Sequence, residues 1–250
     1  MARVALFVAE WVSWSLASGK FASIAPMQLA KKQIDVGLYT NETAAMLEFW
    51  QTKIRLPFEE MLPLGQGVRQ HRHGLNGSVL KLNSVRDPLP PAKSSGYREL
   101  WIADPNVTEP ETVWDPDGNA IRLVLPGYSS VNGIALKLVV SSTARFHEFY
   151  GKVMQLQPAA KNTYRIGDSL VMFEGQVRVA PDNPIRAKGF RYFTIQVVDI
   201  DREHAKLVER GAVEGMAPVT LGETARISFI RDPDGNWIEL SQRASLTGSL

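Results

Sequence analysis

The 250-residue sequence contains no cysteine. Disulfide bonds, thiolate nucleophiles and cysteine-ligated zinc or iron–sulfur sites are therefore excluded. A strong excess of one charge is lacking too, because the formal net charge is +2 and the basic residues are scattered, so we expect no nucleic-acid partner. No apolar run reaches the roughly 18 residues that a membrane-spanning helix requires, so we expect no membrane partner either.

What remains is the composition of an ordinary globular protein, with 44% hydrophobic and 22% charged residues and enough chain for one large domain or two of average size. The N-terminus loosely resembles a signal peptide, with Arg3 before an apolar stretch over residues 4–12. Glu10 interrupts that stretch, so secretion is the weaker alternative. We expect residues 1–30 to be an N-terminal extension outside the fold of a soluble, cytoplasmic protein.

A ten-residue motif occurs twice, as WDPDGNAIRL at residues 114–123 and as RDPDGNWIEL at residues 231–240. Asp-Pro-Asp-Gly-Asn is typical of a tight turn, and the alternating apolar residues after it predict a strand. The main chemical difference within the strand is Arg122 in the first copy and Glu239 in the second. The repeat indicates a duplicated module of which one copy has kept its chemistry.

Other residues of the first half recur about 100 positions later in the sequence: Phe49-Trp50 matches Phe149-Tyr150, and Asp104 matches Asp199. The segment from Asp104 to Asp115 is 22 residues shorter than the matching segment from Asp199 to Asp232, where the second copy has a predicted helix and strand. We therefore predict an α+β fold of two tandem modules built from βαβββ units, with a truncated first module over residues 31–126, a linker over 127–132, a complete second module over 133–243 and a tail over 244–250.

Three features resemble the vicinal oxygen chelate superfamily, which includes glyoxalase I, extradiol dioxygenases and the fosfomycin- and bleomycin-resistance proteins. They are a helix ending in Phe149-Tyr150-Gly151, a strand running into Asp199-Ile200-Asp201, and the Asp-Pro-Asp-Gly-Asn-x-Ile-Glu ending. The resemblance covers about residues 33–243. It implies a cupped sheet around a small-molecule cavity, usually with a divalent metal ion.

The resemblance also implies positions for the metal ligands. In the second module these fall on Gly133, Tyr192 and Glu239, with Glu174 as a further candidate; in the first module they fall on Asp35, Tyr97, Arg122 and Asn83. The two histidines and one carboxylate that usually hold the metal are absent from both sets, and a lone carboxylate binds such ions weakly. We therefore predict no cofactor, with Glu239 as the one ligand if a metal is present.

Glu239 is the strongest candidate for chemistry. It shares a strand face with Trp237 and Ser241, and on a cavity face it could act as a general base; the alternative is an exposed strand end or an ion pair with Lys137 or Arg191. Tyr192, on a face with Thr194 and Gln196, could donate a hydrogen bond to a carbonyl or enolate oxygen. Lys137 could hold an anionic group, or could simply cover apolar surface.

Further polar residues are candidates for contacts with a substrate. His71 and His73 are expected to project from one side of a strand with Arg72 pointing away, as residues at a pocket rim or, less favoured, as a metal pair. Arg122 opposite Asp35 or Glu99 is read as an internal ion pair. The expected substrate-binding set is therefore Lys137, Gln196, Trp237, Glu174, His71 and His73.

Two functions remain open. The first is a metal-independent lyase or isomerase that transfers a proton on a small carbonyl-bearing or aromatic compound, with Glu239 as base and Tyr192 as hydrogen-bond donor. The second is a non-catalytic protein of the bleomycin-resistance type, which sequesters a small molecule. A metal-dependent extradiol dioxygenase is less favoured, because Phe229 stands where that group has a tyrosine. A homodimer is compatible with either function.

Overall fold

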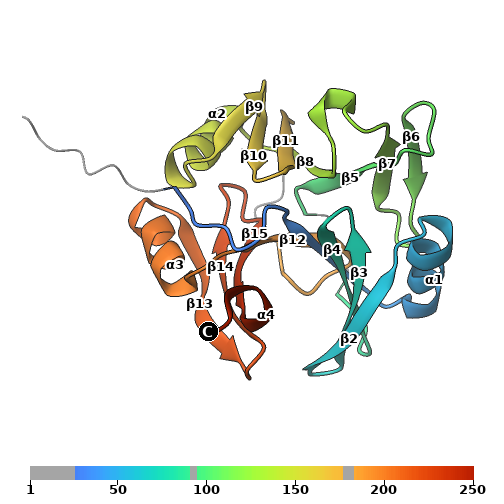
Figure 1. Cartoon of the computed structure of the whole chain (residues 1–250), viewed down its shortest axis with the longest axis horizontal. Helices are drawn as coiled ribbons and strands as arrows, with labels where there is room; N and C mark the ends of the chain where they lie inside the picture. The colour runs from blue at the N-terminus through green and yellow to red at the C-terminus, as the bar shows by residue number, and fades with distance from the viewer. Residues whose placement is uncertain (1–25, 91–94, 177–182) are drawn as a thin grey trace, which may run out of the picture.

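The computed structural model describes residues 26–90, 95–176 and 183–250, which form four consecutive units of strands and short helices (Figure 1). The first unit comprises β1 (Asp35–Thr40), α1 (Thr43–Glu48), η1 (Phe49–Lys53), β2 (Phe58–Gly65), β3 (Val68–Leu75) and β4 (Ser78–Val85). The second comprises β5 (Tyr97–Ala103), β6 (Glu111–Trp114) and β7 (Ala120–Val124), followed by the 3-10 turn η2 (Tyr128–Ser130).

The third unit repeats the plan of the first, with β8 (Ile134–Val140), α2 (Thr143–Glu148), η3 (Phe149–Val153), β9 (Gln157–Ala160), β10 (Thr163–Ile166) and β11 (Ser169–Gly175). The fourth comprises β12 (Gly189–Gln196), α3 (Ile200–Glu209), β13 (Val213–Leu221), β14 (Ala225–Arg231) and β15 (Trp237–Arg243), and the short helix α4 (Ala244–Thr247) follows it. The second unit has only the connection 104–110 where the fourth has α3 and β13. The length deficit seen in the sequence lies there.

The units pair across the two halves of the chain. The first and fourth units join through the antiparallel pair β1–β12 into an eight-stranded sheet of order β13-β14-β15-β12-β1-β4-β3-β2. The second and third join through β5–β8 into a seven-stranded sheet of order β6-β7-β5-β8-β11-β10-β9. Each half of the sequence therefore contributes one unit to each sheet, because the short turn after β7 returns β8 alongside β5.

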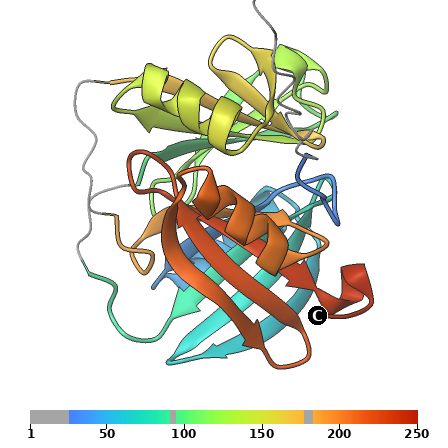
Figure 2. The ribbon, with the colours of Figure 1, turned by 90° about the vertical axis from the view of Figure 1, so that its left-hand side faces the viewer.

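One hydrophobic core fills the space between the two sheets. Residues alternate between the faces of each central strand, so Val36, Leu82 and Ile238 of one sheet meet Leu100 and Leu136 of the other in a single buried cluster. The sheets lie one above the other, with the arms of the eight-stranded sheet curling away from the seven-stranded one (Figures 1 and 2). The concave faces, which carry the alternate residues, therefore point away from each other.

The two copies of the turn motif form the same structure. Asp232 Oδ1 accepts hydrogen bonds from the backbone N–H groups of Asp234 and Asn236, both at 2.9 Å, and Asn236 Nδ2 donates to Asp232 Oδ2 at 2.8 Å. Asp115 makes the corresponding bonds in the first copy. An aspartate that satisfies its own turn explains why the motif begins a strand in both places.

The predicted α+β fold of repeated units is confirmed. Helix α1 continues as a π-turn, in which Ile54 N donates to Phe49 O at 2.9 Å, and the same feature ends α2. The fold begins earlier than the predicted residue 31, since Leu29 bridges to Val197. Residues 1–25 lie outside the described part. No helix within the described residues is long and apolar enough to cross a membrane.

Candidate active site

The eight-stranded sheet curves into a cup, and a cavity of about 580 Å³, which we call the Lys81 cavity, lies on its concave face. Lys81 of β4 and Glu239 of β15 line it together with aromatic and aliphatic side chains, which include Tyr39, Tyr192, Ile185, Met216, Ile227 and Phe229. The Tyr192 ring meets Phe229 edge to face, with 5.8 Å between ring centroids. A space of this size, in which apolar walls surround polar and charged side chains, fits a small-molecule site.

The central feature of this cavity is a buried ion pair. Lys81 Nζ lies 2.7 Å from Glu239 Oε2 and donates a second hydrogen bond of 2.7 Å to Thr194 Oγ1. The Thr194 hydroxyl donates to the same carboxylate oxygen. Lys81 and Glu239 are only 4% and 6% exposed. Burial lowers the pKa of the Lys81 ammonium, and the negative charges of Glu239 and Asp35 oppose that effect.

Two groups in this cavity remain available to a ligand. Glu239 Oε1 has no hydrogen-bond partner among the described residues, since the polar contacts of the carboxylate are to Oε2. The Tyr192 hydroxyl accepts a hydrogen bond of 3.1 Å from Asn83 Nδ2 and has no acceptor for its own proton in the described part of the chain. Burial, with Glu239 and Tyr39 nearby, raises the pKa of Tyr192 well above its usual value, so this phenol stays protonated and can donate.

The position of Tyr192 depends on a glycine in the neighbouring strand. Gly37 of β1 pairs with Tyr192 of β12, and a Cβ atom at residue 37 would lie 2.1 Å from the ring. The ring therefore lies directly over the glycine backbone, and any larger residue would displace it. Tyr39, two residues further along β1, adds a second phenol to the cavity, with a pKa raised to about 12 by burial.

A set of polar side chains supports the ion pair from one side. Asp35 accepts hydrogen bonds from Lys31 Nζ at 2.6 Å, from Val79 N at 2.9 Å and from Gln196 Nε2 at 2.9 Å. Its two oxygens are thus already occupied by protein donors. Gln196, which was expected to bind substrate, is turned toward Asp35 and does not line the cavity.

The residues at the centre of the cup do not fit a divalent metal ion. Lys81 places a positive charge against Glu239, and Asp35 is saturated by protein donors. No group of three or more histidine, aspartate or glutamate side chains in the described ranges could hold a metal. The ammonium group repels a divalent cation, and a single free carboxylate oxygen binds one only weakly.

Glu239 and Tyr192, which the sequence singled out, do lie together. Trp237, which was expected to bind substrate, does not line the cavity. Its indole Nε1 donates to Asn183 O at 2.6 Å, and its ring packs against Phe229 and under the Arg231 guanidinium. Lys81 was missed by the sequence reasoning. Its signal was a lysine directly between Leu80 and Leu82 in a predicted strand, which is unusual unless the charge has a partner.

The expectation that Lys137 faces the same cavity as Glu239 is wrong. Strand β8 pairs with β5 and β11, so Lys137 lies on the concave face of the other sheet, where its Nζ is 3.2 Å from Glu174 and 3.5 Å from Glu99. The expected Arg122 ion pair is also wrong. Asp35 lies in the other sheet, and Arg122 donates to Thr112 Oγ1 at 3.2 Å and lies over the Trp101 ring.

His71 and His73 also face away from the cavity, contrary to expectation. Successive residues of β3 point to opposite faces of the sheet. Gln70 and Arg72 lie on the concave face, where Gln70 Nε2 donates to Asn83 Oδ1, so the two histidines lie on the back of the sheet. His73 Nε2 lies 3.0 Å from Gln51 of η1, and burial lowers its pKa to about 4. His71 Nε2 lies 3.2 Å from Ser84 Oγ. His73 is buried against η1, whereas His71 is half-buried and lines a separate hollow on the back of the sheet.

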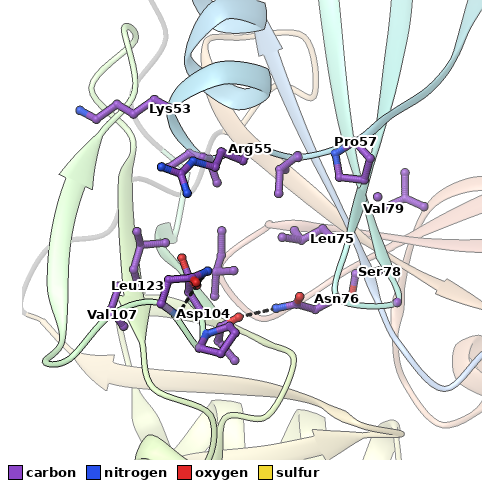
Figure 3. Close-up of a pocket in the computed structure, with 18 of the residues that line it drawn as sticks. Lys53, Arg55, Pro57, Leu75, Asn76, Ser78, Val79, Asp104, Val107 and Leu123 are labelled. Carbon is purple, nitrogen blue, oxygen red and sulfur yellow. Dashed lines mark hydrogen bonds between the residues drawn. The ribbon is translucent and has the colours of Figure 1, made fainter.

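A larger cavity, of about 740 Å³, lies where the second unit lacks counterparts of α3 and β13. Figure 3 shows Lys53 and Arg55 on one side of it and Asp104 on the other, with the hydrogen bond of Asn76 Nδ2 to the Ala103 carbonyl at 2.7 Å. Its charged side chains are exposed or half-buried. Because water screens such groups, the Lys81 cavity is the stronger candidate for chemistry.

Comparison with known proteins agrees with this architecture. The family model "Glyoxalase/Bleomycin resistance protein/Dioxygenase superfamily" matches residues 131–240. A glyoxalase I mutant from Zea mays has a similar fold, with a TM-score of 0.65 and 14% identity over 84% of this chain and 92% of that chain. A putative dioxygenase from Bacillus subtilis gives a TM-score of 0.62 and 11% identity over 88% of this chain and 86% of that one. No curated protein matches the sequence.

Proposed function

Since residues 131–240 belong to the glyoxalase, bleomycin resistance protein and dioxygenase superfamily and the described chain has the fold of its two-module members, we propose that the Lys81 cavity binds a small organic compound with a carbonyl group and transfers a proton on it without a metal ion. This is lyase or isomerase chemistry. The observation that carries the proposal is the buried pair of Lys81 and Glu239 at 2.7 Å, within a cavity that has apolar walls.

The chemistry follows from three polar groups of the cavity: the Lys81 ammonium, which has a third N–H beside the two bonded ones, the Tyr192 hydroxyl and Glu239 Oε1. A carbonyl oxygen near Lys81 Nζ and the Tyr192 hydroxyl would be polarised by both donors. Glu239 Oε1 would then remove the proton from the carbon next to that carbonyl, which leaves an enolate held by the same two donors. Return of the proton to a different carbon gives an isomer, and departure of a group from the adjacent carbon gives an elimination.

The fixed position of the carboxylate favours this role. Lys81 and Thr194 both hold Oε2 of Glu239, so the other oxygen is presented to the cavity in one orientation. The ammonium group supplies the positive charge next to the reacting oxygen that a metal ion supplies in other cups of this kind. Arg186 and Arg243 also line the cavity, which favours a substrate that carries a negatively charged group.

The test is exchange of the α-proton for deuterium. A panel of small keto acids and aromatic ketones is incubated with the protein in D₂O, and loss of the α-proton signal is followed by NMR. We expect Glu239→Gln to slow exchange by about 10²-fold or more while the ligand still binds. Glu174→Gln is the matched control, because it makes the same change in the other sheet.

Three outcomes would contradict the proposal. If exchange persists in Glu239→Gln, Glu239 is not the general base. If exchange is lost in Glu174→Gln, the active site lies on the seven-stranded sheet instead. Stoichiometric zinc, iron or manganese in the purified protein, lost on Glu239→Gln, would replace the metal-independent mechanism.

A second function, sequestration of a small molecule without chemistry, is favoured by the apolar walls of the same cavity. It predicts a tight complex with no exchange in the wild-type protein. Under that function Glu239→Gln leaves affinity within a few-fold of the wild type, whereas Phe229→Ala weakens binding by removing an aromatic wall.

A further inference from the structure

A separate cavity of about 530 Å³ lies between the third and fourth units. It is bounded by the end of α2 and η3, by the segment that follows α3, and by the turn after β14. Figure 2 faces this side of the molecule, with α2 above α3. The lining of this cavity, which we call the basic cleft, includes Arg145, Lys152, Arg210 and Arg231.

The charges of the basic cleft are not balanced. Lys152 Nζ lies 3.1 Å from Glu148 Oε1 and is neutralised by it. The three arginines have no carboxylate partner among the described residues. Asp232 also lines the cleft, but its oxygens accept bonds from its own turn, and burial raises its pKa to about 7, so it contributes less than a full negative charge at neutral pH.

Two of the three guanidinium groups are held by uncharged groups, and the third has a donor nitrogen without a partner. Arg145 Nη2 donates to the Pro233 carbonyl at 2.9 Å. The guanidinium carbon of Arg231 lies 3.8 Å from the Trp237 ring centroid. Arg210 Nη2 is shielded from solvent and has no hydrogen-bond partner in the described part of the chain. Arg210 as a whole is half-buried, but a shielded donor nitrogen without an acceptor is unfavourable in a folded protein, and an anion bound against it would supply that acceptor.

The helix dipole accounts for only part of this arrangement. Arg210 follows the last residue of α3, where a positive charge is favourable. That effect explains a cation at this position but not a shielded nitrogen without a partner, nor two further unpaired arginines around the same space.

We propose that the basic cleft binds a small molecule that carries a phosphate group. Planar guanidinium forks match the oxygens of a phosphate, and three of them suit its charge of nearly two. Phe149, Val153 and Val213 line the same cleft, so an organic group attached to the phosphate meets apolar side chains. The site is distinct from the Lys81 cavity, whose lining shares no residue with it.

Calorimetric titration at low ionic strength tests this proposal with two probes, inorganic phosphate and phenyl phosphate. We expect saturable binding at one site, with phenyl phosphate the tighter because of the apolar side chains; equal affinity would assign the site to free phosphate. Arg210→Ala should weaken binding at least tenfold, and Arg210→Lys should weaken it less. Arg69→Ala removes an exposed arginine elsewhere and should leave binding unchanged.

Thermal unfolding separates this role from a structural one. If Arg210 binds an anion, Arg210→Ala removes repulsion among like charges and does not lower the unfolding temperature in phosphate-free buffer. The same variant abolishes the rise in unfolding temperature that phosphate causes in the wild type. A structural arginine would lower the unfolding temperature and leave that rise intact.

Absence of saturable binding, or equal weakening by Arg69→Ala and Arg210→Ala, would overturn the proposal. Glu239→Gln should retain phosphate binding, so failure of the proton-transfer function and failure of this site are distinguishable.

Discussion

At the scale of single residues, the decisive feature is the lysine at the centre of the eight-stranded cup. Lys81 places a positive charge beside the Glu239 carboxylate and the Thr194 hydroxyl, in a cavity that two tyrosine hydroxyl groups also line. Taking two charges out of water costs several kcal/mol per ion, and a buried pair often contributes less to stability than apolar residues of the same volume. A pair kept in such a place is better explained by chemistry than by stability.

The ion pair makes a prediction about stability. Lys81→Met leaves the Glu239 carboxylate buried without its cationic partner, so the free energy of unfolding should fall by about 3–5 kcal/mol. Adding Glu239→Gln removes the stranded charge and should recover part of the loss. Urea denaturation of the wild type, the two single variants and the double variant measures the coupling. Additive losses would show that the two side chains do not interact.

At the scale of elements, the two turn motifs explain more than where strands begin. Asp232 accepts three hydrogen bonds that favour its ionised form, but complete burial outweighs them and raises its pKa to about 7. Burial likewise raises the pKa of Asp115 to about 6. The same five-residue sequence therefore makes a turn and places a titratable carboxyl group in the interior twice.

The turns predict how stability depends on pH. The folded-state pKa of Asp232 is above its ordinary value of 3.8, so between about pH 4 and 7 the folded protein holds this proton more tightly than the unfolded chain. Its contribution to the free energy of unfolding is present below that range and is lost as pH rises through 7. Asp232→Asn should flatten the fall in stability between pH 5 and 8, as measured by urea denaturation.

The control for this experiment is Asp87→Asn, which changes an exposed aspartate. It should leave the slope between pH 5 and 8 unchanged. If Asp232→Asn has the same slope as the wild type, the carboxyl group is already ionised in the folded protein throughout this range.

At the scale of the whole molecule, the two halves of the chain are interleaved. Strand pairs β1–β12 and β5–β8 each join one half to the other, and the buried cluster between the sheets draws on all four units. The sequence repeat divides the chain at residues 127–132, but the pairing does not follow that division.

Interleaving predicts the behaviour of fragments. Residues 1–126 and 127–250 expressed separately should each lack a cooperative unfolding transition, because each leaves the edges of its central strands and half of the core exposed to water. Mixed or co-expressed, they should form a one-to-one complex with the circular dichroism spectrum of the intact chain. A fragment that unfolds cooperatively as a monomer would show that one half is an independent domain.

The sequence by itself determined the α+β class, the repeated units and the strands after the two turns, because turn chemistry and apolar alternation are local. The resemblance of its motifs to a known superfamily pointed to Glu239 and Tyr192. The sequence could not show that Lys81 lies beside Glu239, from which it is 158 residues away. It also could not show that Lys137, His71 and His73 lie outside the cavity. Those assignments depend on which strands pair and in what register. A shift of one residue moves a side chain to the other face of a sheet, so only the tertiary structure decided which groups share the cavity.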